Sequence, residues 1–490
     1  MTNVHVRVND AATNKPTPVR LRIADLAGRT YAPLGRLAEF ATGRNEDVGS
    51  HVQLGRENFC YIDGSCEVPL PSGVPLTFHV SKGPEYVPLY QEVTLGTGQM
   101  ALRFTIGRRN DLPAEGWFAG DTRCHFLSPH AALLEGQAEG LALIHLLATE
   151  TFVVGRDGNS VPAIPNMVAF SGQQPALERP GCIVAVNTLN THPVLGSLAL
   201  LHCHRAVFPL SFGGADATDD WSLADWCDQC HRKKGLVVWA DPFRFETGIA
   251  PEALADLILG RIDAVECTPG SVRLRDWYRA WSAGIRFPLA GASGKDSNRT
   301  ALGAMRTYAQ LAPDTPLSLA AWIDAVRAGR TFVTAGPLMQ LRVDDQPPGA
   351  TLDHVTGAAP LRISASAVSG PSYSALEVVA NSEVIGRAEP DLMHSATIEI
   401  DYVPTKPCWI AARCIAPPAS GGFAHTSPLF VPMDGRLPSD PTVCRDYGDS
   451  LDRTVDWVNT VGRFDIPRRK EAMLAILKDV VRRLAAKTTD

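Results

Sequence analysis

Long hydrophobic runs are missing from this sequence, and so is a strong charge of either sign. No apolar run approaches the roughly 18 residues that a transmembrane helix requires, and residues 1–16 contain no apolar segment of a secretory signal. The 490 residues carry 46 lysines and arginines against 52 aspartates and glutamates, a net charge of −6. This balance argues against an electrostatic grip on nucleic acid or on an anionic membrane. We therefore expect a cytoplasmic protein with neither of these partners.

Two common catalytic signatures are also absent. No G-x-G-x-x-G follows a strand-like run, which argues against dinucleotide binding, and no G-x-S-x-G is present, which argues against an elbow-type serine hydrolase. The 11 cysteines form an odd, scattered set between Cys60 and Cys444. In a chain of this length such a set indicates buried thiols in a reducing compartment, and not a disulfide framework.

The sequence is long enough for two to four domains, and its patterning changes along the chain. Residues 1–112 alternate between polar and apolar positions with frequent glycine and proline, as in VHVRV and ALRFTI, which predicts a β-sandwich-like domain. Residues 338–435 return to the same alternation in LRISASAV and ATIEIDYV and predict a second such domain. Between them, residues 113–337 show a different pattern.

The middle segment alternates between apolar strand-like runs and helices of about a dozen residues. Ser128, Ser222 and Ser318 are expected to cap helices, because an N-cap serine accepts a hydrogen bond from the first helical turn; Pro251 is expected to open another. Alternating strands and helices imply a parallel sheet, and the number of units favours a barrel. The predicted class is therefore α/β: a distorted (β/α) barrel flanked by two β-sandwich modules.

The tail is expected to be a linker followed by an amphipathic helix. The linker is rich in Asp, Pro and Gly between Met433 and Gly448, and residues 449–490 contain the helix RRKEAMLAILKDVVRRLAAK. Its apolar face is formed by Met473, Leu477, Val481 and Leu484. Packing on the barrel is the simplest interpretation, and a homo-oligomer contact or a membrane-surface contact are the alternatives.

Polar residues recur where the predicted strands of the middle segment end, which is where (β/α) barrels collect function. They include Asp121, Arg123, His125, Glu150, His192, His202, His204, Asp241, Arg244, Glu246, Glu266, Lys295, Asp296 and Asn298. Any one of them alone is explained by a loop cap or a solvated side chain. Their recurrence indicates a polar cleft.

Several of these segments, in this order, resemble the PHP (polymerase and histidinol phosphatase) family, in its CehA/McbA-like metallohydrolase branch. They are GWFAGDTRCHF, LVVWADPF, IDAVEC, FPLAGASGKDSN, AAWIDAVRAGRTFVTAGPL and AHTSPLFV, which together span about residues 115–430. The resemblance implies a PHP-like barrel in which His, Asp and Glu bind divalent ions that activate water. Carried over by position, His125 and Asp296 match metal ligands. Asp121 matches a carboxylate that orients a histidine.

The same alignment of motifs shows departures from the family pattern. Arg123 stands where the family has the first histidine of its opening pair, and Asp241 stands where it has the histidine of a Pro-His. Asn298 replaces the histidine of the closing Asp-x-His, Ala148-Thr149-Glu150 replaces Thr-Asp-His, and Gly196-Ser197 replaces a Gly-His. Asp241 retains oxygen donors for a hard ion, whereas the fixed charge of Arg123 repels cations.

Two functions follow from this mixture. The first is a hydrolase of a small-molecule ester, amide, carbamate or phosphoester, with one zinc, manganese or iron ion held by His125, Asp241, Glu266 and Asp296. In it, Arg123 or His204 stabilises developing negative charge. The second is a barrel without metals that serves as a ligand-binding or interaction scaffold. The proposed site and the hydrolase require the four ligand positions to face one pocket.

Two further clusters have competing interpretations. Cys227, Cys230 and His231 fit the C-x-x-C-H pattern of haem attachment, yet both cysteines share a helical face with Leu223, which favours a buried core. His202 and His204 lie on one side of a predicted strand. They face either the barrel mouth or a helix layer.

Overall fold

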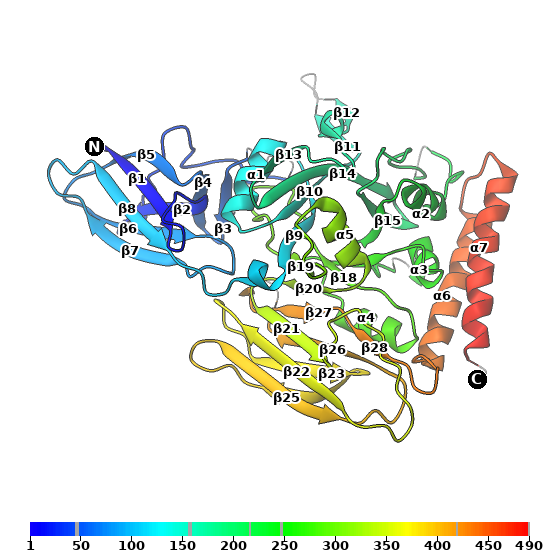
Figure 1. Ribbon diagram of the computed structural model, residues 1–490. Helices are drawn as coiled ribbons and strands as arrows, with labels where there is room; N and C mark the ends of the chain where they lie inside the picture. The colour runs from blue at the N-terminus through cyan, green and yellow to red at the C-terminus, as the bar shows by residue number, and fades with distance from the viewer. Residues whose placement is uncertain (45–48, 155–158, 215–216, 246–247, 418–419, 489–490) are drawn as a thin grey trace.

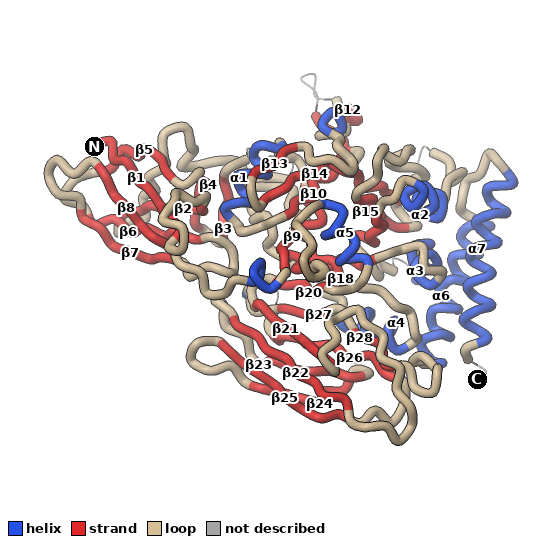
Figure 2. Tube along the Cα trace, in the orientation of Figure 1, coloured by secondary structure: helices blue, strands red, loops and turns tan. Residues whose placement is uncertain are grey.

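The computed structural model describes residues 1–44, 49–154, 159–214, 217–245, 248–417 and 420–488. Glu246, one of the polar residues named above, lies outside these ranges. The fold is mixed α/β, with several sheets, and the two long C-terminal helices lie at the end of the molecule away from the N-terminus (Figure 1, Figure 2). No helix in the described ranges is long and apolar enough to cross a membrane.

The N-terminal part, coloured blue in Figure 1, consists of two sheets that share one core. One sheet has the order β5-β1-β8 and the other β3-β4-β2-β6-β7. Alternate residues such as Val4, Val6 and Val8 of β1 point inward and are fully buried, as the alternating sequence predicts. The strands are β1 (Thr2–Asp10), β2 (Val19–Asp25), β3 (His51–Leu54), β4 (Glu57–Ile62), β5 (Ser65–Leu70), β6 (Pro75–Ser81), β7 (Leu89–Thr94) and β8 (Ala101–Ile106).

The central part is built on a long sheet that begins β18-β17-β16-β15-β14-β10-β9-β19-β20. Its strands are β9 (Trp117–Cys124), β10 (Leu143–Ala148), β14 (Cys182–His192), β15 (Gly196–Leu201), β16 (Leu236–Ala240), β17 (Ala264–Cys267), β18 (Leu289–Gly291), β19 (Arg306–Gln310) and β20 (Thr331–Thr334). The short strand β13 (Leu177–Arg179) pairs with β14, and β11 (Thr151–Val154) with β12 (Ser160–Ala163) forms a separate hairpin.

The direction of β15 differs from the all-parallel expectation. Strands β9, β10 and β14 are mutually parallel, and so are β16, β17 and β18, but β15 is antiparallel to both β14 and β16. A tight turn at Pro193 and Val194 joins β14 to β15, and a connection this short can only make an antiparallel hairpin. The carboxyl ends of β9, β10, β14, β16, β17 and β18 therefore share one rim, whereas β15 ends at the opposite one.

Strand pairing leaves the described central sheet as an open path, but its first and seventh strands approach each other. A single parallel bridge joins Cys124, at the end of β9, to Lys295, shortly after β18. Around it the His125 N–H donates to the Lys295 carbonyl (2.8 Å) and the Gly294 N–H to the Arg123 carbonyl (3.0 Å). Small and aliphatic residues from one face of β10 and β14–β19 form one buried cluster, including Leu147, Ala185, Val238, Ala264 and Ala290.

Helices flank this sheet and begin where the sequence predicts. The hydroxyls of Ser128, Ser222 and Ser318 accept N-cap hydrogen bonds at α1, α2 and α5, and Pro251 precedes α3. The helices are α1 (Pro129–Ala138), α2 (Leu223–Arg232), α3 (Glu252–Ile258), α4 (Leu274–Ser282) and α5 (Leu319–Arg327), with short 3-10 turns η1 (Leu112–Glu115) and η2 (Met167–Ala169). Local signals were sufficient here because capping depends only on neighbouring residues.

The C-terminal β module continues the central sheet and adds a second one. The path extends through β27-β26-β23-β24, with β28 also paired to β26, while β21-β22-β25 forms a separate sheet (Figure 2). The strands are β21 (Leu338–Val343), β22 (Leu361–Val368), β23 (Ala375–Ala380), β24 (Glu383–Ala388), β25 (Ser395–Tyr402), β26 (Cys408–Ile415), β27 (Ala424–Thr426) and β28 (Leu429–Val431). Their inward residues share a core with β9, β10 and β14.

The tail forms a helical hairpin and not a linker with one helix. Helix α6 (Pro441–Thr460) begins inside the predicted linker, with Asp440 capping it, and α7 (Pro467–Ala486) returns beside it (Figure 1, orange and red). The expectation of a linker to Gly448 was wrong because proline at the first helical position starts helices as well as loops. Met473, Leu477, Val480 and Leu484 are buried in the core that α6 and α3 share, so packing within the chain covers the apolar face.

Candidate functional site

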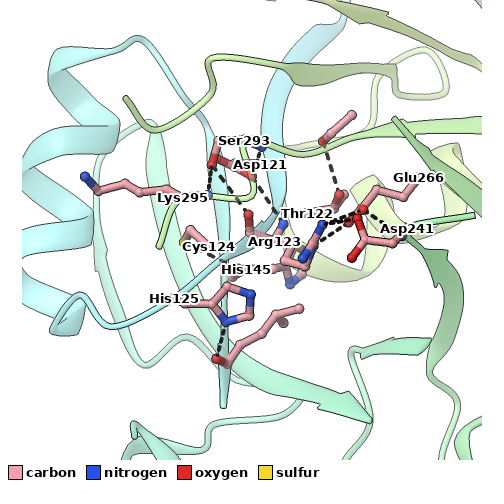
Figure 3. Close-up of polar contacts among 12 residues, drawn as sticks. Asp121, Thr122, Arg123, Cys124, His125, His145, Asp241, Glu266, Ser293 and Lys295 are labelled. Atoms are coloured by element: carbon pink, nitrogen blue, oxygen red, sulfur yellow. Dashed lines mark hydrogen bonds and ion pairs between the residues drawn. The ribbon is translucent and has the colours of Figure 1, made fainter. Parts of the chain in front are cut away.

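The polar centre of the carboxyl-end rim is an ion-pair cluster around Arg123, the next-to-last residue of β9 (Figure 3). The Arg123 Nε donates to Glu266 Oε2 (2.7 Å) and Nη2 donates to Glu266 Oε1 (2.8 Å), which is a bidentate pair. Nη2 also donates to Asp241 Oδ1 (3.3 Å), and the Asp241 N–H donates to Glu266 Oε1 (3.2 Å). Three strands, β9, β16 and β17, thus converge on one guanidinium.

Burial gives this cluster its electrostatic character. The Glu266 side chain is 1% exposed and the Arg123 side chain 11%, so both charges are largely removed from water. Burial alone would lower the pKa of Arg123, but Glu266 and then Asp241 raise it above its ordinary value. Burial raises the pKa of Glu266, and the Arg123 charge acts against that shift. The bidentate geometry indicates a charged pair at neutral pH.

His125 lies just beyond the end of β9, next to the cluster but not part of it (Figure 3). Its Nδ1 is 3.1 Å from the Leu147 carbonyl, and a carbonyl only accepts, so Nδ1 carries the proton. Burial, and then the charge of Arg123, lower the pKa of His125 to about 3. Within the described ranges no hydrogen bond joins His125 to Asp241, Glu266 or Asp296.

The remaining predicted site residues have other partners. Asp296 forms an ion pair with Arg44 (2.9 Å), whose side chain is largely exposed. His204 lies after β15, at the opposite rim from Asp241, because Leu201 pairs with the first residue of β16 while Asp241 follows the last. It is exposed, and its Nδ1 lies 3.3 Å from the Lys233 carbonyl. The structure therefore brings Arg123, Asp241 and Glu266 together, and does not bring His204 or Asp296 to them.

Asp121 stabilises backbone and does not orient a histidine. Its carboxylate accepts hydrogen bonds from the N–H groups of Ser293 (3.0 Å), Gly303 (2.8 Å) and Arg123 (3.2 Å). It is fully buried, and burial raises its pKa in spite of these bonds. The segment after β18 is thereby held against β9, next to the bridge between Cys124 and Lys295.

A divalent ion does not fit the donors as they are arranged. Both Glu266 oxygens and one Asp241 oxygen already accept hydrogen bonds from Arg123, and the guanidinium lies where these carboxylates converge. No group of three or more His, Cys, Asp or Glu residues in the described part of the chain is placed to hold a metal ion. A metal site would require Arg123 to leave its two carboxylates.

A cavity of about 490 Å³ opens beside Asp241, a size typical of small-molecule sites. Arg244 and Ser197 contribute polar groups, and the rings of Trp239 and Trp457 contribute apolar walls. Arg244 is 54% exposed, and among the described residues the carboxylate that it approaches is that of Asp241, at 3.9 Å, which leaves its charge available to a ligand. Trp457 comes from α6, a helix absent from the sequence-based prediction, so the sequence alone gave no reason to place it here.

His192, at the end of β14, closes the wall of this cavity. Its Nδ1 accepts the N–H groups of Val194 (3.1 Å) and Leu195 (2.8 Å), so Nε2 carries the proton and donates to Asp219 (2.9 Å). Asp219 also accepts the Arg463 N–H (2.7 Å), between α6 and α7. The β14–β15 hairpin is thereby fastened to the helical hairpin, which fixes both sides of the cavity.

The C-x-x-C-H segment is part of the core. Cys227 and Cys230 of α2 are fully buried in the same apolar cluster as Leu223, and His231 bonds to Asp263 (2.9 Å). The prediction of a buried helix face is confirmed. All 11 cysteines are free and ten are buried, as predicted for a set of thiols without a disulfide framework.

Comparisons with known proteins add little to this geometry. No family model matches the chain, and no curated protein matches it. Among solved structures, PsfC from Pseudomonas syringae PB-5123 aligns over 42% of this chain and 88% of its own, at 16% identity and a TM-score of 0.28. A similarity this weak carries no argument about fold or function.

Proposed function

We propose that residues 113–337 form a PHP-like barrel that works without a metal ion, as a scaffold that binds a small organic anion in the cavity beside Asp241. The observation that carries the proposal is the bidentate pair between Arg123 and Glu266, completed by Asp241. In it, the fixed cation of the chain occupies the point where carboxylates from β16 and β17 converge. The guanidinium balances one of the two carboxylate charges without any ion from solution.

Two features support a barrel. The bridge from Cys124 to Lys295 links the first and seventh strands of the path β18-β17-β16-β15-β14-β10-β9. One face of these strands contributes to a single buried cluster, which also contains Trp322, Ile323 and Val326 of α5; the interior of a barrel is likewise filled by side chains. The segment order that resembles the PHP family gives the same assignment from the sequence.

The chemistry of the cavity favours an anion with a planar body. Arg244 supplies a half-exposed guanidinium, and the partly exposed Trp457 supplies ring surface on which a planar ligand stacks. The Asp241 carboxylate is shared with Arg123 and so contributes less repulsion than a free carboxylate. p-Nitrophenyl phosphate is a suitable binding probe because it is an anion with a planar body, and together with the neutral ester p-nitrophenyl acetate it reports hydrolysis through release of p-nitrophenolate.

The competing proposal is the metal-dependent hydrolase with His125, Asp241, Glu266 and Asp296 as ligands. The two are separated by incubating untagged protein with each p-nitrophenyl ester, with and without added zinc or manganese. We expect saturable binding of the phosphate ester, weakened about tenfold or more in Arg244→Met because a charge-assisted hydrogen bond is lost, and no release of p-nitrophenolate above buffer. Release that requires metal and is lost in His125→Ala would establish the hydrolase instead.

A further inference from the structure

A second cavity, which shares no lining residue with the one beside Asp241, lies where the N-terminal β part meets α1 and β9. Its volume is about 370 Å³, within the usual range for small-molecule sites. One side comes from the segment after β6, and the other from the end of α1, the residues just before β10 and the β13–β14 turn. The two parts approach closely here: a Cβ on Gly83 would lie 2.2 Å from the Glu139 carbonyl oxygen, so only glycine fits there.

Lys82 is the buried cation of this cavity. It is 9% exposed, and its Nζ donates to the backbone carbonyls of Pro18 (3.0 Å) and Gln137 (2.5 Å). These bonds use two of the three ammonium protons. No carboxylate in the described ranges forms an ion pair with Lys82, and burial lowers its pKa to about 8. A buried ammonium without a counter-ion is costly, so the cavity favours an added negative charge.

The carboxylates near Lys82 already have partners of their own. Glu139 accepts hydrogen bonds from Arg20 and from Tyr61 Oη (2.8 Å). Asp10 accepts from Tyr86 Oη (2.7 Å) and from two backbone N–H groups. None of them moves to Lys82 without breaking these bonds.

Arg108, the second cation of the cavity wall, also has acidic partners already. Arg108 is paired with Asp111 and lies 3.5 Å from Glu85, so it offers little net charge to a ligand. Asp10 and Glu85 line the same cavity and would repel a dianion. Lys82 therefore provides the attraction for a single negative charge. The remaining wall is largely apolar, with Phe118, Leu141, Ala142 and prolines such as Pro84.

We propose that this cavity binds a small monocarboxylate with a short apolar chain, whose carboxylate accepts a hydrogen bond from Lys82 Nζ. The apolar chain lies against Phe118, Leu141 and the prolines. This ligand differs from the one proposed for the cavity beside Asp241, because there the charge is presented by Arg244 and the walls are aromatic. The two cavities are therefore tested independently.

Hexanoate is the probe, and thermal unfolding of the full chain is the measurement. Hexanoate should raise the Tm of the wild type in a saturable way, because a ligand that binds only the folded state stabilises it. Hexanol, with the same chain and no charge, and inorganic phosphate should not. Lys82→Met should weaken hexanoate binding about tenfold or more, as expected on losing a charged hydrogen bond.

Two matched variants locate the effect. Lys233 also donates to a backbone carbonyl, that of Ala206 (3.2 Å), but lies outside the cavity, so Lys233→Met should respond as the wild type does. Arg244→Met should also keep the response, which excludes binding beside Asp241. An equal response in Lys82→Met, or none in the wild type, would overturn the proposal.

Should Lys82→Met fail to fold, a measurement on the wild type alone tests whether hexanoate binds at Lys82. Reductive methylation with formaldehyde and a borane, mapped by peptide mass spectrometry, compares Lys82 with the exposed Lys15. Protection of Lys82 by hexanoate, with unchanged methylation of Lys15, supports the site. Equal methylation of Lys82 with and without hexanoate contradicts it.

Discussion

The guanidinium of Arg123 contacts two carboxylates that the sequence suggested as metal ligands. Its bonds to both oxygens of Glu266 are short and both side chains are largely buried, so the pair is sensitive to the loss of either member. A buried charge left without its partner is a large penalty, whereas an exposed pair contributes little. This contrast separates Arg123 from Arg244, which approaches the same Asp241 from a half-exposed position.

Removing the guanidinium should therefore destabilise the fold. Arg123→Met should lower the free energy of unfolding by about 3–5 kcal/mol, because Glu266 stays buried without a counter-ion. Arg244→Met, the matched control, should change it by less than about 1 kcal/mol. Urea denaturation measures both. In the double variant Arg123→Met/Glu266→Gln, part of the loss should be recovered. A loss no larger for Arg123→Met than for Arg244→Met would contradict the account.

For single residues, the sequence predicted which side chains lie at the site better than it predicted what each of them does there. Asp241 and Glu266 were expected at one rim because Asp241 follows one strand of a parallel pair and Glu266 lies near the end of the other, and they are there. The bidentate contact of Arg123 was not predictable, because it depends on how far β9 extends past its neighbours. Asp121 was expected to orient a histidine. Instead it accepts hydrogen bonds from the backbone N–H groups of Ser293 and Gly303, which are distant in sequence.

Among the elements, the β14–β15 hairpin decides which histidines reach the site. An antiparallel β15 sends His202 and His204 to the opposite rim and leaves His192, at the end of β14, beside the cavity. Apolar strands look alike in sequence whether they run parallel or antiparallel. The starts of the helices could be predicted from the sequence, because the N-cap hydrogen bonds of Ser128, Ser222 and Ser318 involve only neighbouring residues. The direction of β15 could not be predicted in this way and is known only from the structure.

Strand β27 carries a second element-scale test, through His425. Its Nδ1 lies 2.7 Å from the Thr426 carbonyl, which only accepts, so Nδ1 carries a proton; its Nε2 lies 2.8 Å from Tyr278 Oη, which ties the C-terminal β module to α4. Burial lowers the pKa of His425 to about 3 from an ordinary 6.5. Between these values the unfolded chain binds a proton that the folded chain does not, so stability falls as pH falls.

His425→Gln should remove this pH dependence. Between about pH 6 and pH 4 the free energy of unfolding of the wild type should fall more steeply than that of the variant, by about 1.4 kcal/mol per pH unit for one proton. The measurement is urea denaturation across this range. Parallel slopes for the two proteins would show that His425 does not contribute.

For the whole molecule, the helical hairpin of α6 and α7 is an integral part of the structure (Figure 1). It shares one core with α2, α3 and α4, and Trp457 of α6 lines the cavity beside Asp241. Leu477 of α7 is fully buried in this core. The apolar face that suggested a homo-oligomer is thus covered by the same chain.

A buried leucine and an exposed neighbour test this arrangement. Leu477→Ala should lower the free energy of unfolding by about 2–5 kcal/mol through the cavity it creates. Lys478→Ala, one residue further and exposed, should change it by about 0.5 kcal/mol or less. Size-exclusion chromatography should give the wild-type elution volume for both. A variant Leu477→Ala that keeps full stability but changes its oligomeric state would place this face at an interface between chains.

The most direct test of the central claim is the metal content of protein purified without an affinity tag, measured by inductively coupled plasma mass spectrometry. With Arg123 as the cation of the site, we expect zinc, manganese and iron far below one equivalent, and a Tm that chelation leaves unchanged. One equivalent or more of a divalent metal, lost in Asp241→Ala or Glu266→Ala, would contradict it.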